Sequence, residues 1–132
     1  MRERYTVPRE TFPVSGEKFA SDTTVSADYL ALDQTPSRED VERMPGLLLL
    51  EFGTAWCGFC RAAAPAVSAL LEKHPEVRHV KIEDGSGRRL GRSFRVKLWP
   101  NLVFLKDGVV VRQLARPTST ELREAFDALT RP

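Results

Sequence analysis

Cys57 and Cys60 are the most reactive candidate residues of the sequence, and the chain has no other cysteine. A Cys-x-x-Cys pair can act as a redox dithiol or supply half of a four-ligand zinc site. The two histidines of the chain, His74 and His79, are the other candidate zinc ligands, but we expect His79 to lie in a strand after Pro75. The pattern therefore favours a redox dithiol, with zinc as the weaker alternative.

The sequence around the pair predicts that it opens a helix. The apolar run 47–52 predicts a strand buried on both faces, and the alanine-rich segment 60–73 predicts a helix. A thiol at a helix N-terminus meets unpaired backbone N–H groups, which stabilise the attacking thiolate. We therefore predict that Cys57 attacks a substrate disulfide and that the more covered Cys60 resolves the mixed disulfide.

The remaining strands must complete a sheet around the dithiol. Apolar runs predict three more strands, at 77–82, 101–106 and 109–114. The dipeptide Asp107-Gly108 between the last two is a strong hairpin signal. We also expect a short strand at 24–27 or at 29–32.

Capping signals predict the remaining helices. Thr35 as N-cap and Pro36 at the first helical position predict a short helix. A short basic helix is expected at 88–94, and Thr118 with Glu121 forms a capping box for a final helix. Strands that alternate with helices and then end in a hairpin and a helix predict an α/β domain with a mixed sheet.

The segment Trp56-Cys57-Gly58-Phe59-Cys60 resembles the active site of the thioredoxin family. Further residues match the family's pattern at the right separations. Pro65 matches the proline that kinks the active-site helix, and Pro100 matches the cis-proline that faces the dithiol. Asp107-Gly108 matches the hairpin turn, and Glu51 falls on the buried acid six residues before the first cysteine.

The resemblance covers roughly residues 24–130 and implies a fold and an activity. The implied fold is a thioredoxin-like three-layer sandwich, with a mixed central sheet of four or five strands flanked by helices. We expect an irregular arm at 1–22 and the domain at 23–132. The implied activity is protein-disulfide oxidoreduction through a redox-active disulfide, with no other cofactor and no metal. The expected partners are protein disulfides and a reductase or another dithiol.

Glu51 is the candidate proton shuttle, because burial disfavours the charged form of a carboxyl and so suits it to take a proton from Cys60. The alternative is a strand glutamate paired with Lys81 or Lys97. His79 falls near the family's lysine beside the buried acid. It could tune Glu51, but we favour a surface strand residue.

The candidate substrate-binding residues surround the dithiol. They are Trp56, Gly58, Phe59, Trp99 and Pro100. Phe59 replaces the proline of a typical thioredoxin, which favours a more oxidising protein. Trp99 is expected to extend an aromatic rim with Trp56 and Phe59, or else to pack as an ordinary core residue. Gly58 is expected to give the turn its conformational freedom.

Composition narrows the remaining function classes. A chain of 132 residues with 42% hydrophobic and 29% charged residues is typical of one globular domain. A net charge of +2 gives no support for nucleic-acid or membrane partners. No apolar stretch of signal-peptide length begins the chain, so we expect a cytoplasmic protein, or a periplasmic one whose signal was removed.

Three functions remain in order of preference. The first is a thioredoxin-like reductant, most simply a monomer. The second is a more oxidising exchange or isomerase-type protein. The third is a binding module of the same fold in which the dithiol is not essential.

Overall fold

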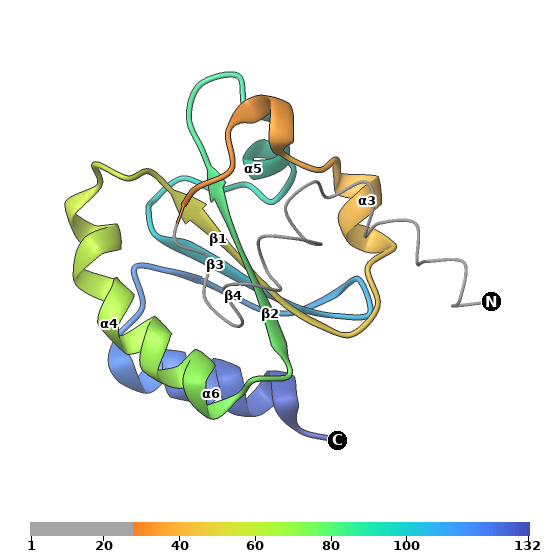
Figure 1. Cartoon of the computed structure of the whole chain (residues 1–132), viewed down its shortest axis with the longest axis vertical. Coiled ribbons are helices and arrows are strands. Elements are labelled where there is room, and N and C mark those ends of the chain that lie inside the picture. The colour runs from red at the N-terminus through yellow and green to blue at the C-terminus, as the bar shows by residue number, and fades with distance from the viewer. Residues whose placement is uncertain (1–27) are drawn as a thin grey trace.

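The computed structural model describes residues 28–132. The expected arm at 1–22 and the candidate strand at 24–27 lie outside the described residues. The described part contains a four-stranded sheet in the order β2-β1-β3-β4 (Figure 1). Its strands are β1 (Leu47–Gly53), β2 (Val77–Glu83), β3 (Asn101–Lys106) and β4 (Val109–Ala115). β1 runs parallel to β2 and antiparallel to β3, and β4 is antiparallel to β3, so the expected mixed α/β sheet is confirmed.

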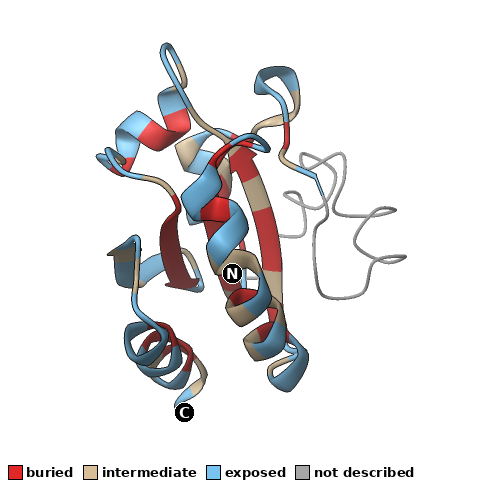
Figure 2. Ribbon diagram, turned by 90° about the vertical axis from the view of Figure 1, so that its left-hand side faces the viewer, coloured by how far each residue is buried: buried red, intermediate tan, exposed pale blue. Residues whose placement is uncertain are grey.

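Helices cover both faces of this sheet (Figure 1). They are α3 (Arg38–Glu42), α4 (Gly58–Lys73), α5 (Arg89–Ser93) and α6 (Ser119–Thr130). α4 and α6 pack on the face that includes Leu49, while α3 and α5 pack on the face that includes Leu48 and Leu50. Figure 2 shows the buried residues gathered in the strands and on the inner sides of the helices. β1 is therefore a central strand buried on both faces, as its apolar run indicates.

The predicted start of the first helix at Thr35 is wrong. Thr35 instead ends a 3-10 turn, η2 (Leu32–Gln34), and α3 begins three residues later. Ser37 is the true N-cap, because its hydroxyl accepts the Asp40 backbone N–H at 3.0 Å while the Asp40 carboxylate accepts the Ser37 N–H at 3.2 Å. This reciprocal pair satisfies two helix-end donors, which fixes the helix start at this serine.

The strand expected at 29–32 is reduced to a single bridge. Leu30 pairs in parallel with Ile82 on the outer side of β2. Its N–H donates to the Lys81 carbonyl at 2.8 Å, and its own carbonyl accepts the Glu83 N–H at 3.0 Å. This bridge holds the neighbouring side chain, Tyr29, against the edge of the sheet.

The hairpin and the last helix follow their local signals. Asp107 and Gly108 both have positive φ, 51° and 83°, which matches the twist of a two-residue hairpin turn. The capping box at α6 is confirmed, with the Thr118 hydroxyl accepting the Glu121 N–H at 3.1 Å. α5 is two residues shorter than expected, beginning at 89 and ending at 93.

Candidate active site around Cys57 and Cys60

The two cysteines occupy the first turn of α4, directly after β1. Cys57 is the N-cap residue, and its sulfur accepts the backbone N–H of Cys60 at 3.2 Å. Both thiols are free, and both are buried. α4 therefore begins at Gly58, two residues before the expected start, because the Cys57 sulfur itself caps the helix.

Gly58 does not need glycine for its backbone conformation. It is the first helical residue, it is not among the residues of positive φ, and an added Cβ would meet no atom within 4 Å. The expectation that it frees a tight turn is wrong, because the chain enters the helix at that point. Its missing side chain instead leaves open space next to Cys57.

Gly53 is the glycine that the site requires. A Cβ at this last residue of β1 would lie 2.5 Å from the Cys60 sulfur and 3.3 Å from the Tyr29 hydroxyl oxygen. The absence of a side chain lets both groups approach the end of β1. The Tyr29 hydroxyl and the Cys60 sulfur both lie beside this glycine and interact with each other, a contact that sequence reasoning missed.

Burial is the main influence on the pKa values of Cys60 and Tyr29. It raises the pKa of Cys60 from 9.0 to about 11, and a hydrogen bond with Cys57 adds to the rise. Hydrogen bonds from the Thr54 backbone and from Tyr29 act in the opposite direction. The pKa of Tyr29 is raised from its ordinary value by burial and by the nearby negative charges of Glu51 and Cys60. The phenol therefore stays protonated and remains a hydrogen-bond donor.

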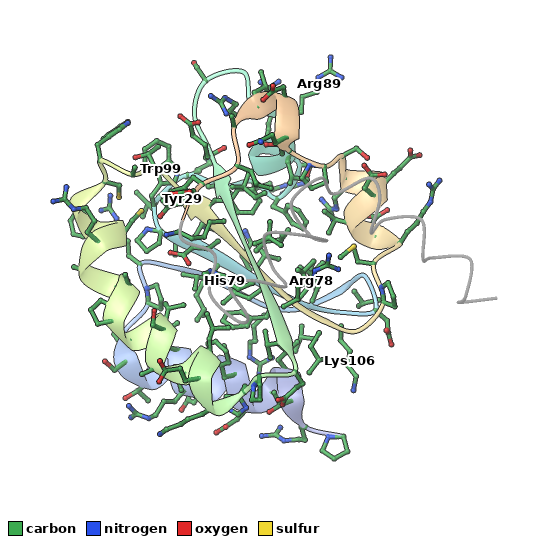
Figure 3. The ribbon with its side chains drawn as sticks, viewed as in Figure 1. Tyr29, Arg78, His79, Arg89, Trp99 and Lys106 are labelled. Atoms are coloured by element: carbon green, nitrogen blue, oxygen red, sulfur yellow. The ribbon has the colours of Figure 1, made fainter. Side chains whose placement is uncertain are left out.

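Glu51 is paired with His79, and neither residue lies at the surface. The Glu51 Oε1 and His79 Nε2 atoms are 2.8 Å apart, and the two residues are only 2% and 3% exposed. The expectation that His79 is a surface strand residue is wrong, because its β2 position faces the side that α4 covers (Figure 3). The lysine pairing is also wrong for Lys81, whose Nζ instead lies 4.3 Å from the centroid of the Tyr29 ring.

Aromatic side chains form an exposed rim outside the dithiol. Trp56 is 71% exposed and Phe59 is 58% exposed. The half-buried Trp99 meets Trp56 edge to face, with ring centroids 5.7 Å apart. Its indole N–H donates to the Asp84 carboxylate at 2.9 Å, which fixes the ring next to Pro100 (Figure 3). The Trp99–Pro100 peptide bond is cis.

Arg116 ties this rim together, and no sequence signal singled it out. Its guanidinium carbon lies 3.8 Å from the centroid of the Phe59 ring. Its Nε donates to the Trp99 carbonyl at 2.8 Å, and its backbone N–H donates to the Pro100 carbonyl at 2.9 Å. One residue after β4 therefore joins the cis-proline segment to the first turn of α4.

The histidines considered for a zinc site are engaged elsewhere. His74 stacks on Phe126, with ring centroids 5.5 Å apart, and His79 is bonded to Glu51. Within residues 28–132, no three side chains among His, Cys, Asp and Glu gather closely enough to hold a metal ion. In the same range, no helix is long and apolar enough to cross a membrane.

Comparison with known proteins decides the family. The family model described as Thioredoxin matches residues 29–128. The chain belongs to the thioredoxin family. Reduced thioredoxin 2 from Pseudomonas aeruginosa PAO1 is 49% identical, with a TM-score of 0.70 over 80% of this chain and 96% of that one. The thioredoxin of Fasciola hepatica is 31% identical, with a TM-score of 0.60 over 73% and 94%.

A curated relative gives the same result at lower identity. Thioredoxin H5 of Oryza sativa subsp. japonica is 28% identical over 109 residues, which cover 83% of this chain and 79% of the relative. With this family and the Cys57–Cys60 pair, the chain is a thioredoxin-like thiol–disulfide oxidoreductase. Membership of the family suggests disulfide substrates and a reductase as partner.

Two features distinguish this chain from the thioredoxin pattern. Phe59 stands where a typical thioredoxin has proline, and its ring lies under the guanidinium of Arg116. His79 lies near the position of the family's lysine and is hydrogen-bonded to Glu51. Phe59 in the outer rim and His79 beside the buried acid thus each have a defined partner, Arg116 and Glu51 respectively.

Proposed function

We propose that this thioredoxin-family protein acts mainly as a reductant of protein disulfides, with Cys57 as nucleophile and Cys60 as resolving thiol. The observation that carries the proposal is the cap of α4. The Cys57 sulfur accepts the Cys60 N–H at 3.2 Å. Backbone N–H groups at a helix N-terminus stabilise a thiolate, which is the attacking species.

The reaction then proceeds in two balanced steps. The Cys57 thiolate attacks one sulfur of a partner disulfide, forms a mixed disulfide and releases the first partner thiolate. Cys60 loses its proton and attacks the Cys57 sulfur, which forms the Cys57–Cys60 disulfide and releases the second partner thiolate. The two thiolates take up protons, so two electrons pass from the dithiol to the partner.

Glu51 is the proposed acceptor of the Cys60 proton. Its side chain is almost fully buried, and its Oε1 atom lies at hydrogen-bond distance, 2.8 Å, from the Nε2 atom of His79. A carboxylate can act as a general base toward a nearby thiol. The negative charge of Glu51 also acts on Tyr29, which lies beside Cys60. The carboxylate therefore belongs to the same buried cluster as Tyr29 and Cys60.

The proposed substrate surface is the aromatic rim with its open space. Trp56 and Phe59 present exposed rings, and Trp99 is held beside Pro100. Gly58 leaves room for a partner backbone near Cys57. Such a surface fits an extended protein segment without requiring a particular sequence, because aromatic faces contact apolar side chains of many shapes.

The proposed setting is the cytoplasm, where thiols are kept reduced and a dithiol can act as donor. A reductase or another dithiol returns the electrons, and the chain works as a monomer with no metal and no cofactor beyond its own disulfide. No nucleic-acid or membrane partner is proposed. The exposed Phe59 is the feature that favours the alternative, a more oxidising exchange protein.

The test combines turnover with the redox poise. We expect the protein to accelerate reduction of insulin disulfides by dithiothreitol, and Cys57→Ser to abolish this, because the attacking sulfur is lost. Equilibration in glutathione buffers with thiol counting gives the reduction potential of the pair. A pair held as disulfide even by largely reduced glutathione supports the reductant. A pair that stays reduced there supports the exchange protein, and a pair that never forms a disulfide leaves only the binding module.

A further inference from the structure

Tyr29 lies beside the Cys60 sulfur, although it precedes Cys60 by 31 residues in the chain. In the proposed reaction this sulfur must become an anion. We propose that the Tyr29 hydroxyl is a catalytic hydrogen-bond donor that stabilises the Cys60 thiolate while the Cys57–Cys60 disulfide closes. The inference rests on the proposed function and adds a residue to its second step. Glu51 takes the proton, and Tyr29 stabilises the charge left on sulfur.

Three contacts hold the phenol in place. The backbone of Leu30 is bonded to β2 on both sides, which anchors the residue next to Tyr29. The ring lies against Gly53, where an added Cβ would stand 3.3 Å from the hydroxyl oxygen and 3.5 Å from the ring carbon Cε1. The ammonium of Lys81 lies 4.3 Å from the ring centroid and contributes a cation–π contact. The hydroxyl is thereby held at Gly53, beside the Cys60 sulfur.

The resolving thiol needs such a donor more than Cys57 does. The first-turn N–H of Cys60 is directed to the Cys57 sulfur, and so does not serve Cys60. Cys60 is only 2% exposed, so water contributes little to solvating its charge. The Thr54 backbone and the Tyr29 hydroxyl both act on this sulfur in the direction that favours its thiolate, and the hydroxyl lies beside it at Gly53. These two polar groups thus replace part of the missing solvation.

A cavity of about 220 Å³ lies beside this contact. The charged or titratable side chains that line it are those of Asp28, Tyr29, Cys60, Arg61 and Lys81. Cys57 and Glu51 act on the same phenol from the dithiol and from β1. Apart from Tyr29, these groups are unchanged in the variants tested below. A substitution that removes only the phenol oxygen therefore reports the effect of the Tyr29 hydroxyl alone.

The test is Tyr29→Phe, which keeps the ring and removes only the oxygen. The reduced protein is mixed with 5,5′-dithiobis(2-nitrobenzoate) in a stopped-flow instrument between pH 5 and pH 10. Attack by Cys57 releases one coloured thiolate, and attack by Cys60 on the resulting mixed disulfide releases a second. The control is Thr130→Val, which removes a hydroxyl that donates to Phe126 near the far end of α6.

We expect Tyr29→Phe to leave the first release unchanged and to slow the second by about tenfold or more, because a donor to a charged acceptor is lost. The pH at which the second release becomes fast should shift upward, since the thiolate is less stabilised. Thr130→Val should match wild type in both phases. Equal second phases for Tyr29→Phe and wild type, with the same pH midpoint, overturn the proposal and leave the proposed function intact.

A second measurement covers the case in which Tyr29→Phe does not fold. The chain has only two tyrosines, so 3-fluorotyrosine can replace both with little change of shape. The fluorinated phenol is a stronger donor, and we expect the second release to become faster. An unchanged second release contradicts the proposal. If wild type releases only one coloured thiolate and forms no disulfide, the proposed function itself fails, and the role of Tyr29 fails with it.

Discussion

The dithiol has an outer side and an inner side, and they differ in almost every physical property. The outer side consists of Trp56, Cys57, Phe59, Trp99 and Arg116, and it exposes two aromatic rings. The inner side consists of Tyr29, Glu51, Gly53, Cys60 and His79. There Glu51 is hydrogen-bonded to His79, and Tyr29 interacts with Cys60. Both sides meet in a single turn of α4, where the two sulfurs lie.

Two identical residues three positions apart acquire different roles from these surroundings. Cys57 caps the helix and receives its first-turn N–H, next to an open apolar surface. Cys60 is buried, and its pKa is raised by that burial, so it reacts only when other groups remove its proton and stabilise its charge. The outer side therefore governs the encounter with a partner, and the inner side governs resolution.

The largest expected effect is on the inner side, from Glu51→Gln. Glutamine has nearly the same shape and can still bond to His79, but it cannot accept the Cys60 proton. We expect resolution to slow by about 100-fold or more, the lower range for loss of a general base, with the first step unchanged. Two-phase thiolate release in the stopped-flow assay measures both steps.

The matched control for Glu51 is Glu83→Gln. This carboxylate lies at the end of β2, more than a third of its side chain is exposed, and it pairs with Arg88 at 3.7 Å. We expect wild-type kinetics in both phases for the control. Equal resolution rates for Glu51→Gln and wild type would remove Glu51 from the mechanism and leave its pair with His79 a structural one.

A smaller effect is expected from Gly53→Ala, which alters the packing of the inner side. The new methyl group would lie 2.5 Å from the Cys60 sulfur, so the sulfur or the backbone must move. Overpacking of this kind costs about 1–3 kcal/mol, which denaturant unfolding of the reduced protein measures. Gly58→Ala, where a Cβ meets nothing within 4 Å, should not be destabilised. Equal stabilities for the two variants would contradict the close approach at Gly53.

The smallest effect is expected on the outer side, from Arg116→Ala. The variant loses a cation–π contact with Phe59 and a hydrogen bond to the Trp99 carbonyl. We expect the free energy of unfolding to fall by about 1 kcal/mol and KM for a protein disulfide to rise, with the resolution phase unchanged. Arg112→Ala on β4 is the control, since its guanidinium donates to the carbonyl of the adjacent Val111. A slower resolution phase in Arg116→Ala would mean that the two sides are not independent.

The elements whose causes are local could be predicted from the amino-acid sequence alone. The apolar run of β1, the Asp107-Gly108 turn and the Thr118 capping box each act within a few residues, and the structure has all three. The Cys-x-x-Cys pair at a helix start is equally local. The predicted helix start at Thr35 is wrong because two possible capping residues, Thr35 and Ser37, lie close together. The reciprocal hydrogen bonds of Ser37 with Asp40 make Ser37 the N-cap.

The side chains that meet at the dithiol are brought together by long-range packing, which no local pattern reveals. Glu51 and His79 are 28 residues apart in the chain, and Arg116 reaches back 17 residues to the Trp99 carbonyl. Tyr29 reaches Cys60 only because a single bridge holds Leu30 on β2 and because Gly53 has no side chain. Such contacts depend on the register of β1 against β2, which is set by packing over both faces of the sheet. Local patterns thus placed the two sulfurs, and long-range packing supplied the groups that set their chemistry.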